Sequence, residues 1–262
     1  MTLSNRTLRD EIREYWSDRA ATFDQEPGHR IADGAEMQAW RALFTRHLGP
    51  ARGRRLLDLA SGTGEIARLC QDLGFRVTGL DWAEPMLERA QAKLPDVSFV
   101  QADAECTMLP TAGFDVIVTR HLVWTLVDPA AAFTEWHRLL APNGVLLVVD
   151  GDFVQRNWFA RLLAPKSAVS PHASRHQEIL NRVYFSNGAR ADAVTALLST
   201  AGFTEITVDH NLRAVHRAQA RALGWRKSLL RRSEHRYVIT ARKPETPGDA
   251  AHHSDGDGAH TR

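Results

Sequence analysis

The chain has 262 residues, of which 44% are hydrophobic and 24% are charged, and its formal net charge is +2. This composition is typical of a globular protein, and the balanced charge argues against nucleic acid or a membrane surface as partner. No apolar run approaches the roughly 20 residues that span a bilayer, the N-terminus lacks an apolar signal core, and neither cysteine belongs to a Cys-x-x-Cys pair. We therefore expect a cytoplasmic protein without a metal site.

The N-terminal part of the chain predicts two helices, at residues 9–24 and 34–48. The second helix places Met37, Trp40 and Phe44 on one face at helical spacing, which is typical of a helix that packs against a core.

From residue 54 onward, strand patterns alternate with helix patterns. The predicted strands are residues 54–59, 75–80, 97–100, 114–119 and 144–150, and the predicted helices are 64–73, 84–93 and 129–140. The tetrapeptide APNG, residues 141–144, predicts a turn before the last of these strands. Strands that alternate with helices indicate a parallel sheet with helical crossovers.

The regular alternation stops after Asp150. Residues 151–190 have no clean period, so we expect an insertion over one end of the sheet. The predicted elements that complete the domain are a helix at 189–201, a strand at 204–209, a basic helix at 213–224 and a strand at 235–241. The tail, residues 243–262, is polar and rich in Gly, Asp and His, so we expect it to be disordered.

The stretch LLDLASGTGEIARL, residues 56–69, joins a predicted strand to a predicted helix through two glycines. Glycine lets a ligand approach the main chain because it has no Cβ. A P-loop would have Lys-Ser/Thr after the second glycine, and this chain has Glu65-Ile66, which excludes it. The spacing Gly62-x-Gly64-x-x-Ala67 fits a dinucleotide loop, which by itself leaves an NAD-dependent oxidoreductase open.

Five successive motifs, taken together, are more specific than this loop. They are LLDLASGTGEIA, VTGLDWAEPML, FVQADAECTMLP, FDVIVTRHLVWTLVDP and RLLAPNGVLLVVD. In this order they resemble the class I S-adenosylmethionine-dependent methyltransferases, most closely the small-molecule group called methyltransferase type 11, which includes quinone-biosynthesis enzymes. The resemblance covers about residues 50–150 strongly and the remainder in outline.

The resemblance implies an α/β fold, a doubly wound, mostly parallel, seven-stranded Rossmann-like sheet. It also implies an N-terminal helical lid at residues 1–48 and a methyltransferase domain at 49–242 with a cap inserted at about 151–190. The implied cofactor is S-adenosylmethionine, with S-adenosylhomocysteine as product. The sequence leaves the oligomeric state open between monomer and homodimer.

The resemblance also implies roles at the methionine and ribose ends of the cofactor. Gly62 and Gly64 would let the backbone approach the methionine moiety, and Asp58 would accept a hydrogen bond from its ammonium group. Asp81 would accept from both ribose hydroxyls through its two carboxylate oxygens. The alternative for each aspartate is a role as a helix cap.

Further residues are implied at the adenine and the sulfonium. Trp82 and Met86 would pack on the adenine face, although both are also typical core residues. Asp103 and Ala104 would bind the adenine amine and ring, and Arg120 would lie beside the sulfonium and the acceptor.

One position of the loop departs from the family. The family usually has glycine where this chain has Ala60, and cysteine or another small residue at Ser61. Because alanine is small, we expect little change beyond a narrower loop.

The acceptor chemistry leaves a weaker trace, because alignment does most of the work in methyl transfer and a base is needed only if the acceptor must lose a proton. His121 follows a predicted strand end and carries an imidazole that titrates near neutral pH, so it is the first candidate base. Asp150 and Asp152 are the other candidates. The alternatives are a backbone hydrogen bond for His121 and turn positions for the two aspartates.

Aromatic side chains and histidines are candidates for contacting the acceptor. The predicted substrate-binding residues are Tyr15, Trp16, His29, Trp124, Trp158 and Tyr184. The family's Asn/Asp-Pro-Pro-Tyr/Phe motif for adenine or glutamine substrates is replaced here by TRHLVWTLVDP. We therefore predict transfer of a methyl group to nitrogen or oxygen of a small organic molecule, a specialised metabolite.

Two other functions stay open. The basic helix places Arg213, Arg217 and Arg221 on one face, which is typical of a solvated surface but would suit an RNA or protein methyltransferase. A non-catalytic cofactor-binding subunit would carry the same five motifs.

Overall fold

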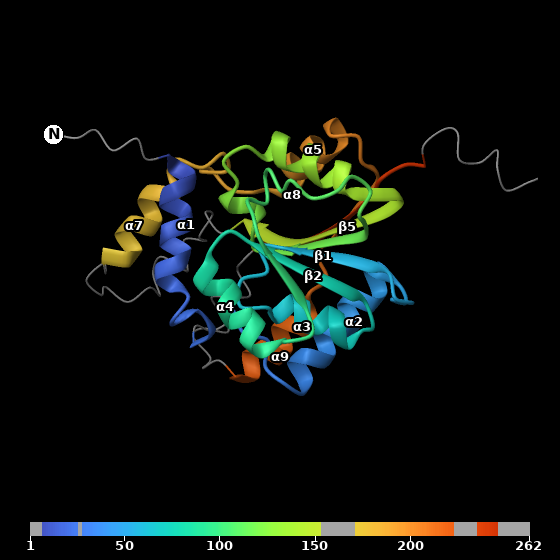
Figure 1. The fold of residues 1–262 in the computed structure, drawn as a ribbon, viewed down its shortest axis with the longest axis horizontal. Coiled ribbons are helices and arrows are strands. Elements are labelled where there is room, and N and C mark those ends of the chain that lie inside the picture. The colour runs from blue at the N-terminus through green and yellow to red at the C-terminus, as the bar shows by residue number, and fades with distance from the viewer. Residues whose placement is uncertain (1–6, 26–27, 153–170, 223–234, 246–262) are drawn as a thin grey trace, which may run out of the picture.

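Seven strands form one sheet in the order β3-β2-β1-β4-β5-β7-β6 in the computed structural model (Figure 1). The structure describes residues 7–25, 28–152, 171–222 and 235–245. The strands are β1 (Arg55–Leu59), β2 (Arg76–Asp81), β3 (Ser98–Gln101), β4 (Phe114–Arg120), β5 (Leu140–Asp152), β6 (Thr204–Asp209) and β7 (His235–Arg242). All neighbours pair in parallel except β7, which is antiparallel to both β5 and β6. The predicted doubly wound, mostly parallel, seven-stranded sheet is confirmed.

The order of the strands reverses between β1 and β4. The chain runs outward from β1 to β3 and then returns to place β4 on the other side of β1. Ligands of open α/β sheets bind in the crevice at such a reversal, outside the carboxyl ends of the strands. The topology therefore directs attention to the loops after β1 and β4.

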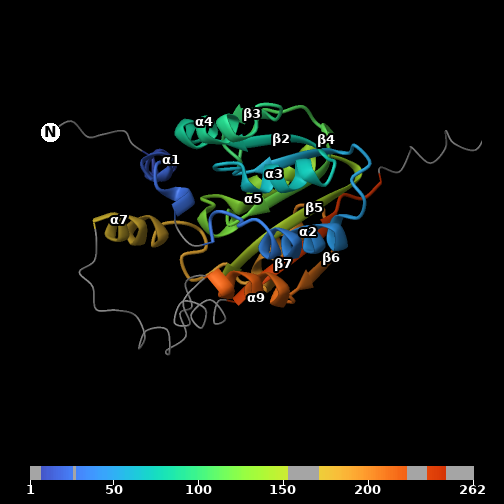
Figure 2. The same ribbon diagram turned by 90° about the horizontal axis from the view of Figure 1, so that it is seen from below.

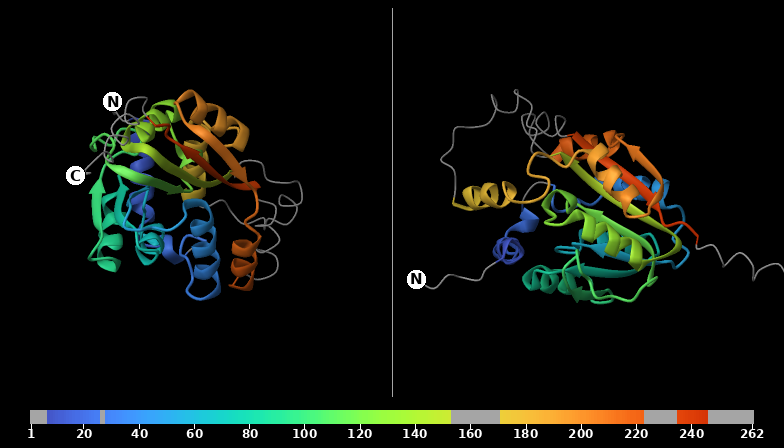
Figure 3. Two further views of the ribbon diagram at one scale, coloured as in Figure 1. Left: turned by 90° about the vertical axis from the view of Figure 1, so that its right-hand side faces the viewer. Right: turned by 90° about the horizontal axis from the view of Figure 1, so that it is seen from above.

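Helices cover both faces of the sheet (Figure 1 and Figure 3). One face carries α2 (Ala35–Leu48), α3 (Glu65–Asp72), α4 (Glu84–Lys93) and α9 (Arg213–Ala222), and the other carries α5 (Pro129–Leu139) and α8 (Ala191–Thr200). In β4, Val116 and Val118 pack in the core on the side of α2, α3 and α9, and Ile117 packs in the core on the side of α5 and α8. This alternation is what a strand buried on both faces requires.

Beyond the carboxyl edge of the sheet, α1 (Leu8–Arg19) and α7 (Pro171–Leu180) lie side by side (Figure 1 and Figure 2). Thr7 caps α1 in a reciprocal capping box with Asp10. The helix ends at Arg19 rather than at the predicted residue 24, and a short 3-10 helix, η1 (Phe23–Gln25), follows.

The element α7 was not predicted, because its sequence has no apolar period. It packs against α1 through a small apolar cluster that includes Ile12, Tyr15 and Ile179, and the ion pair of Arg175 with Asp18 at 2.9 Å lies beside it. The remainder of the predicted cap, residues 153–170, lies outside the described residues, as does the tail from residue 246.

The predicted turn at residues 141–144 is a bulge inside β5. The pairing of β4 with β5 jumps from Phe114 opposite Leu140 to Val116 opposite Val145, and Asn143 has a φ of 62°. Backbone hydrogen bonds to Lys243 keep the bulge in the sheet, which is why β5 begins earlier than the apolar pattern indicated. Within the described residues no helix is both long and apolar enough to cross a membrane.

Candidate active site

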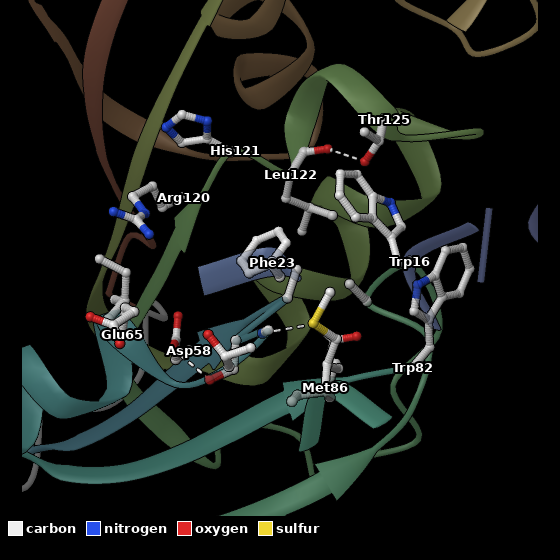
Figure 4. Close-up of a pocket in the computed structure, with 18 of the residues that line it drawn as sticks. Trp16, Phe23, Asp58, Glu65, Trp82, Met86, Arg120, His121, Leu122 and Thr125 are labelled. Carbon is white, nitrogen blue, oxygen red and sulfur yellow. Dashed lines mark hydrogen bonds between the residues drawn. The ribbon is translucent and has the colours of Figure 1, made fainter. Parts of the chain in front are cut away.

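A cavity of about 1120 Å³, counted with its open mouth, lies at the carboxyl ends of β1, β2 and β4 (Figure 4). Its walls come from the β1–α3 loop, the segments after β2, β3 and β4, and the N-terminal segments α1 and η1. The cavity therefore lies where ligands of open α/β sheets bind, at the reversal of the strand order.

The glycine loop forms the floor of this cavity, but its two glycines do different things. Gly62 lines the cavity, and its N–H donates to Asp81 Oδ2 at 2.9 Å. Gly64 is not among the residues that line the cavity, and its contact with the cofactor stays a prediction. A Cβ on Gly64 would lie 3.2 Å from both Ala90 and Leu94, because this residue packs α3 against α4.

Ala60 adopts a left-handed backbone conformation, which glycine would adopt more readily. Its φ is 55°, in the left-handed region, and it lines the cavity. This conformation costs an L-residue with a Cβ about 1–2 kcal/mol. The following residue, Ser61, anchors the loop through its N–H to Leu80 O at 2.9 Å.

A further glycine shapes the site without lining it. A Cβ on Gly79 in β2 would lie 2.4 Å from Phe99 Cε1 and 2.9 Å from Ser61 Oγ, so no side chain fits. Sequence reasoning missed this residue, although a glycine inside a strand often marks a close approach of another group.

Asp58 is buried at the end of β1, with 1% of its surface exposed, and lines the cavity. Its carboxylate accepts a hydrogen bond from Ser61 Oγ at 2.8 Å. Burial raises the pKa of Asp58 to about 7, against the opposing effects of the Ser61 hydrogen bond and the positive charge of Arg120. A cationic group in the cavity would therefore favour the ionised carboxylate.

Asp81 ends β2 and also lines the cavity. Each carboxylate oxygen accepts one backbone hydrogen bond, from Gly62 and from Ala83, both at 2.9 Å. Burial raises the pKa of Asp81, and these backbone bonds oppose that shift. Because each carboxylate oxygen has two lone pairs, both retain capacity for a hydroxyl donor.

The segments after β2 and β3 bring together Trp82, Met86, Asp103 and Ala104, all of which line the cavity. Asp103 Oδ1 accepts from the N–H of Glu105 at 2.8 Å, and Ala104 O accepts from Trp136 Nε1 at 2.8 Å. The four residues predicted for the adenine therefore line the same cavity, and hydrogen bonds hold the segment after β3 in place.

Glu105 is a cavity residue that sequence reasoning missed. It is buried, and it accepts backbone hydrogen bonds from Val127 at 2.6 Å and Asp128 at 3.1 Å. It also pairs with Arg9 of α1. One carboxylate thus joins the N-terminal helix α1 to the loops after β3 and β4.

Arg120 is a buried cation at the end of β4. Its Nη2 donates to His29 O at 2.5 Å, and its Cζ lies 5.6 Å from the centre of the Trp40 ring. Within the described part of the chain, Nη1 of Arg120 is buried without a hydrogen-bond partner. Burial lowers the pKa of Arg120 to about 10, although Glu65 and Asp58 oppose the shift. A buried guanidinium with an unused donor is suited to an anionic ligand group.

Glu65, at the start of α3, already has its own partners. It accepts from Ile31 N–H at 2.9 Å and lies 3.1 Å from Lys93 Nζ and 3.2 Å from Arg68 Nη2. The negative charge of Glu65 is therefore largely balanced, which leaves Arg120 Nη1 available to a ligand.

His121 is the first residue after β4, and it lines the cavity with a φ of 64°. The indole Nε1 of Trp124 donates to His121 O at 2.9 Å. Trp124 meets Trp16 edge-on with ring centres 6.4 Å apart, while Phe23 and His29 stack at 4.0 Å. Figure 4 shows Phe23 between the side with Asp58, Glu65 and Arg120 and the side with Trp16 and Trp82.

Four other predicted site residues do not line the cavity. Asp150 is 1% exposed and accepts backbone hydrogen bonds, and Asp152 packs against Gly188. Tyr15 is buried against His176, and Tyr184 is 58% exposed. Of the three predicted bases, His121 is therefore the one that lines the cavity. Trp158 lies outside the described residues.

The basic helix α9 packs on α2, where Gln219 Nε2 donates to Glu36 Oε1 at 2.7 Å. Arg213 and Arg217 are exposed, and the side chain of Arg221 lies outside the described part of the structure. This arrangement is that of a helix with one packed face and one solvated face.

Comparisons with known proteins agree with this geometry. A family model described as a methyltransferase domain matches residues 57–148. Demethylmenaquinone methyltransferase of Paenarthrobacter aurescens is 28% identical over 224 residues, which cover 80% of this chain and 86% of that protein. The ubiquinone/menaquinone biosynthesis C-methyltransferase of Francisella philomiragia is 34% identical over 120 residues, which cover 42% of this chain and 48% of that protein.

Among solved structures, the fold is similar to phosphoethanolamine N-methyltransferase 2 of Haemonchus contortus in complex with S-adenosyl-L-methionine, with a TM-score of 0.66. The identity is 16%, and the match covers 92% of this chain but only 61% of the other. At that identity the likeness shows the fold alone.

Proposed function

We propose that this chain, a class I S-adenosylmethionine-dependent methyltransferase, methylates a small organic molecule at nitrogen or oxygen. The observation that carries the proposal is the cavity itself. Three ionisable groups, Asp58, Asp81 and Arg120, converge on one part of it, and aromatic side chains with His121 form the wall beyond. The curated relatives are named for quinone biosynthesis, so transfer to carbon is the competing outcome.

The residues at the floor of the cavity fit the cofactor. Asp58 is suited to its ammonium group and Asp81 to its ribose hydroxyls, while the unpartnered Nη1 of Arg120 is suited to its carboxylate. No phosphate has to be accommodated, which agrees with the absence of a lysine after Gly64. When bound, S-adenosylmethionine supplies a methyl group that its sulfonium already activates.

The protein's own contribution is to align the acceptor and exclude water. Trp16, Phe23 and Trp124 offer flat apolar faces, and a neutral His121 can take a proton from an oxygen or nitrogen acceptor. Residues 8–25 contribute side chains to the cavity, which supports a role of the N-terminal segment as a lid.

Calorimetric titration with S-adenosylhomocysteine tests the cofactor site. We expect Asp81→Ala to weaken binding by about tenfold or more, because a hydrogen bond to a charged group contributes roughly 1.5–3 kcal/mol. Equal affinity of Asp81→Ala and wild type would show that the residue does not bind the ribose.

The acceptor is then sought by measuring S-adenosylhomocysteine formation against a panel of hydroxylated, amino and quinol compounds. The position of the new methyl group is read by NMR of the product. A methyl group on carbon would refute the nitrogen or oxygen proposal, and no turnover of any compound would favour a non-catalytic subunit.

A further inference from the structure

The turn after β4 carries two residues that line the cavity, His121 and Trp124, and the backbone of His121 is in a disfavoured conformation. His121 has a φ of 64°, where a side chain with a Cβ is disfavoured. The next residues form a short 3-10 helix, η2 (Val123–Thr125), which carries Trp124. Such a backbone persists only where its surroundings hold it in place.

The strand β5 supplies that support. The N–H of His121 donates to Val149 O at 3.0 Å, and the N–H of Val123 donates to Asp150 Oδ2 at 2.7 Å. The other carboxylate oxygen, Asp150 Oδ1, accepts from the N–H of Gly151 at 2.8 Å. The N–H of Trp124 also stabilises the charged carboxylate. One buried side chain therefore binds the start of η2 to the sheet.

Asp150 lies behind the cavity rather than in its wall. It is 1% exposed and is not among the described residues that line the cavity. Tyr237 lies opposite it in β7, with its hydroxyl donating to Ala189 O at 2.9 Å, and Arg236 contributes a favourable positive charge. Burial nevertheless raises the pKa of Asp150 to about 7, so the backbone donors are needed to keep it ionised.

We infer that Asp150 is a positioning residue for methyl transfer, whose carboxylate holds the turn that presents His121 and Trp124 to the acceptor. The inference rests on the proposed function for its effect on the rate, but its geometric part does not. A change at Asp150 should therefore alter the acceptor side of the cavity, where His121 and Trp124 lie. It should leave the cofactor-binding floor on β1 and β2 unchanged.

The test compares Asp150→Asn with wild type at pH 8. The readouts are the ¹H–¹⁵N resonance of the Trp124 indole, the ring resonances of His121 and the affinity for S-adenosylhomocysteine. We expect the Trp124 and His121 resonances to shift while the affinity stays within about twofold, because an amide nitrogen facing a backbone N–H cannot accept its hydrogen bond. With an acceptor from the panel, kcat should fall by about 10–100-fold at an unchanged KM for the cofactor.

Asp115→Asn is the matched control. It removes a carboxylate that binds Arg55 at the opposite end of β4, so it should leave both resonances and kcat as they are. If Asp150→Asn does not fold, Asp150→Glu decides, because it keeps the charge but displaces it by one methylene group.

A folded Asp150 variant with unchanged Trp124 and His121 resonances, or with unchanged kcat, would overturn the inference. Failure of the proposed function looks different, since it would appear as absent S-adenosylhomocysteine binding or absent turnover in the wild type.

Discussion

At the scale of single residues, the loop after β1 combines strain and buried charge at the point where a ligand would bind. Ala60 has a left-handed backbone, and Asp58 keeps a buried carboxyl group whose pKa lies near neutrality. Both features depart from what the residue types prefer in isolation. Such departures are concentrated at functional sites because folding alone does not favour them.

Ala60→Gly should raise the free energy of unfolding by about 0.5–1 kcal/mol. Glycine removes a conformational cost of about 1–2 kcal/mol and adds an entropy cost of about 0.5–1 kcal/mol in the unfolded chain. Urea denaturation measures the difference. Ala196→Gly, on the exposed face of α8, is the control and should lower stability by about 1 kcal/mol. If Ala60→Gly lowered the stability by the same amount as Ala196→Gly, the backbone of Ala60 would not be strained.

The affinity for S-adenosylhomocysteine should rise as pH rises from 6 to 8. The pKa of Asp58 is about 7, so the carboxyl group is mostly protonated at pH 6 and mostly ionised at pH 8. A ligand ammonium group favours the ionised form, so binding should tighten by about tenfold over this range. Titration calorimetry at both pH values measures the change. Asp58→Asn should bind with little pH dependence, and an equal dependence in both proteins would place its origin elsewhere.

At the scale of elements, the site depends on close approaches between strands, loops and helices that glycines allow. Gly64 brings α3 against α4, and Gly79 brings the β1–α3 loop and Phe99 against β2. The sequence motif drew attention to Gly62 and Gly64 as ligand contacts. Only the packing of α4 shows that Gly64 contacts a helix, and nothing local to Gly79 distinguishes it from a weak position in a strand.

Gly79→Ala should destabilise the protein by about 1–3 kcal/mol, because the new methyl group would overlap the Phe99 ring. A double-mutant cycle with Phe99→Ala, followed by thermal or urea unfolding, separates this clash from other effects. The cost of Gly79→Ala should be much smaller in the Phe99→Ala background. Equal costs in both backgrounds would mean that the ring is not what excludes the side chain.

At the scale of the whole molecule, the cavity lies between the N-terminal segments and the sheet. Thr63 Oγ1 of the glycine loop lies 2.5 Å from Asp24 of η1, and Arg9 of α1 pairs with Glu105 beyond β3. A ligand in the cavity would contact both parts at once. Binding should therefore stabilise the folded chain as one unit, by mass action.

S-adenosylhomocysteine at about 100 times its dissociation constant should stabilise the fold by about 2.7 kcal/mol. For a chain of this size that corresponds to a rise in Tm of about 5–10 °C. Differential scanning fluorimetry measures the shift. Asp81→Ala at the same ligand concentration is the control and should show a clearly smaller rise, and no rise in the wild type would contradict the cofactor site.

The sequence by itself determined the sheet, the crossover helices and most of the cofactor floor. Strands and helices follow from local hydrophobic period, and the residues at the ends of parallel strands meet at one edge whatever the loops do. For that reason Asp58, Asp81, Asp103 and Arg120 were all found, and all line the cavity.

Only the tertiary structure decided the contacts that join segments distant along the chain. The helix α7 meets α1 through Ile179 and the ion pair of Arg175 with Asp18, and Glu105 pairs with Arg9, 96 residues away. Asp150, predicted as a base, accepts a hydrogen bond from the N–H of Val123, 27 residues earlier in the chain. The residue type indicates which chemistry is possible, but the direction of a buried carboxylate depends on which backbone groups the fold brings to it.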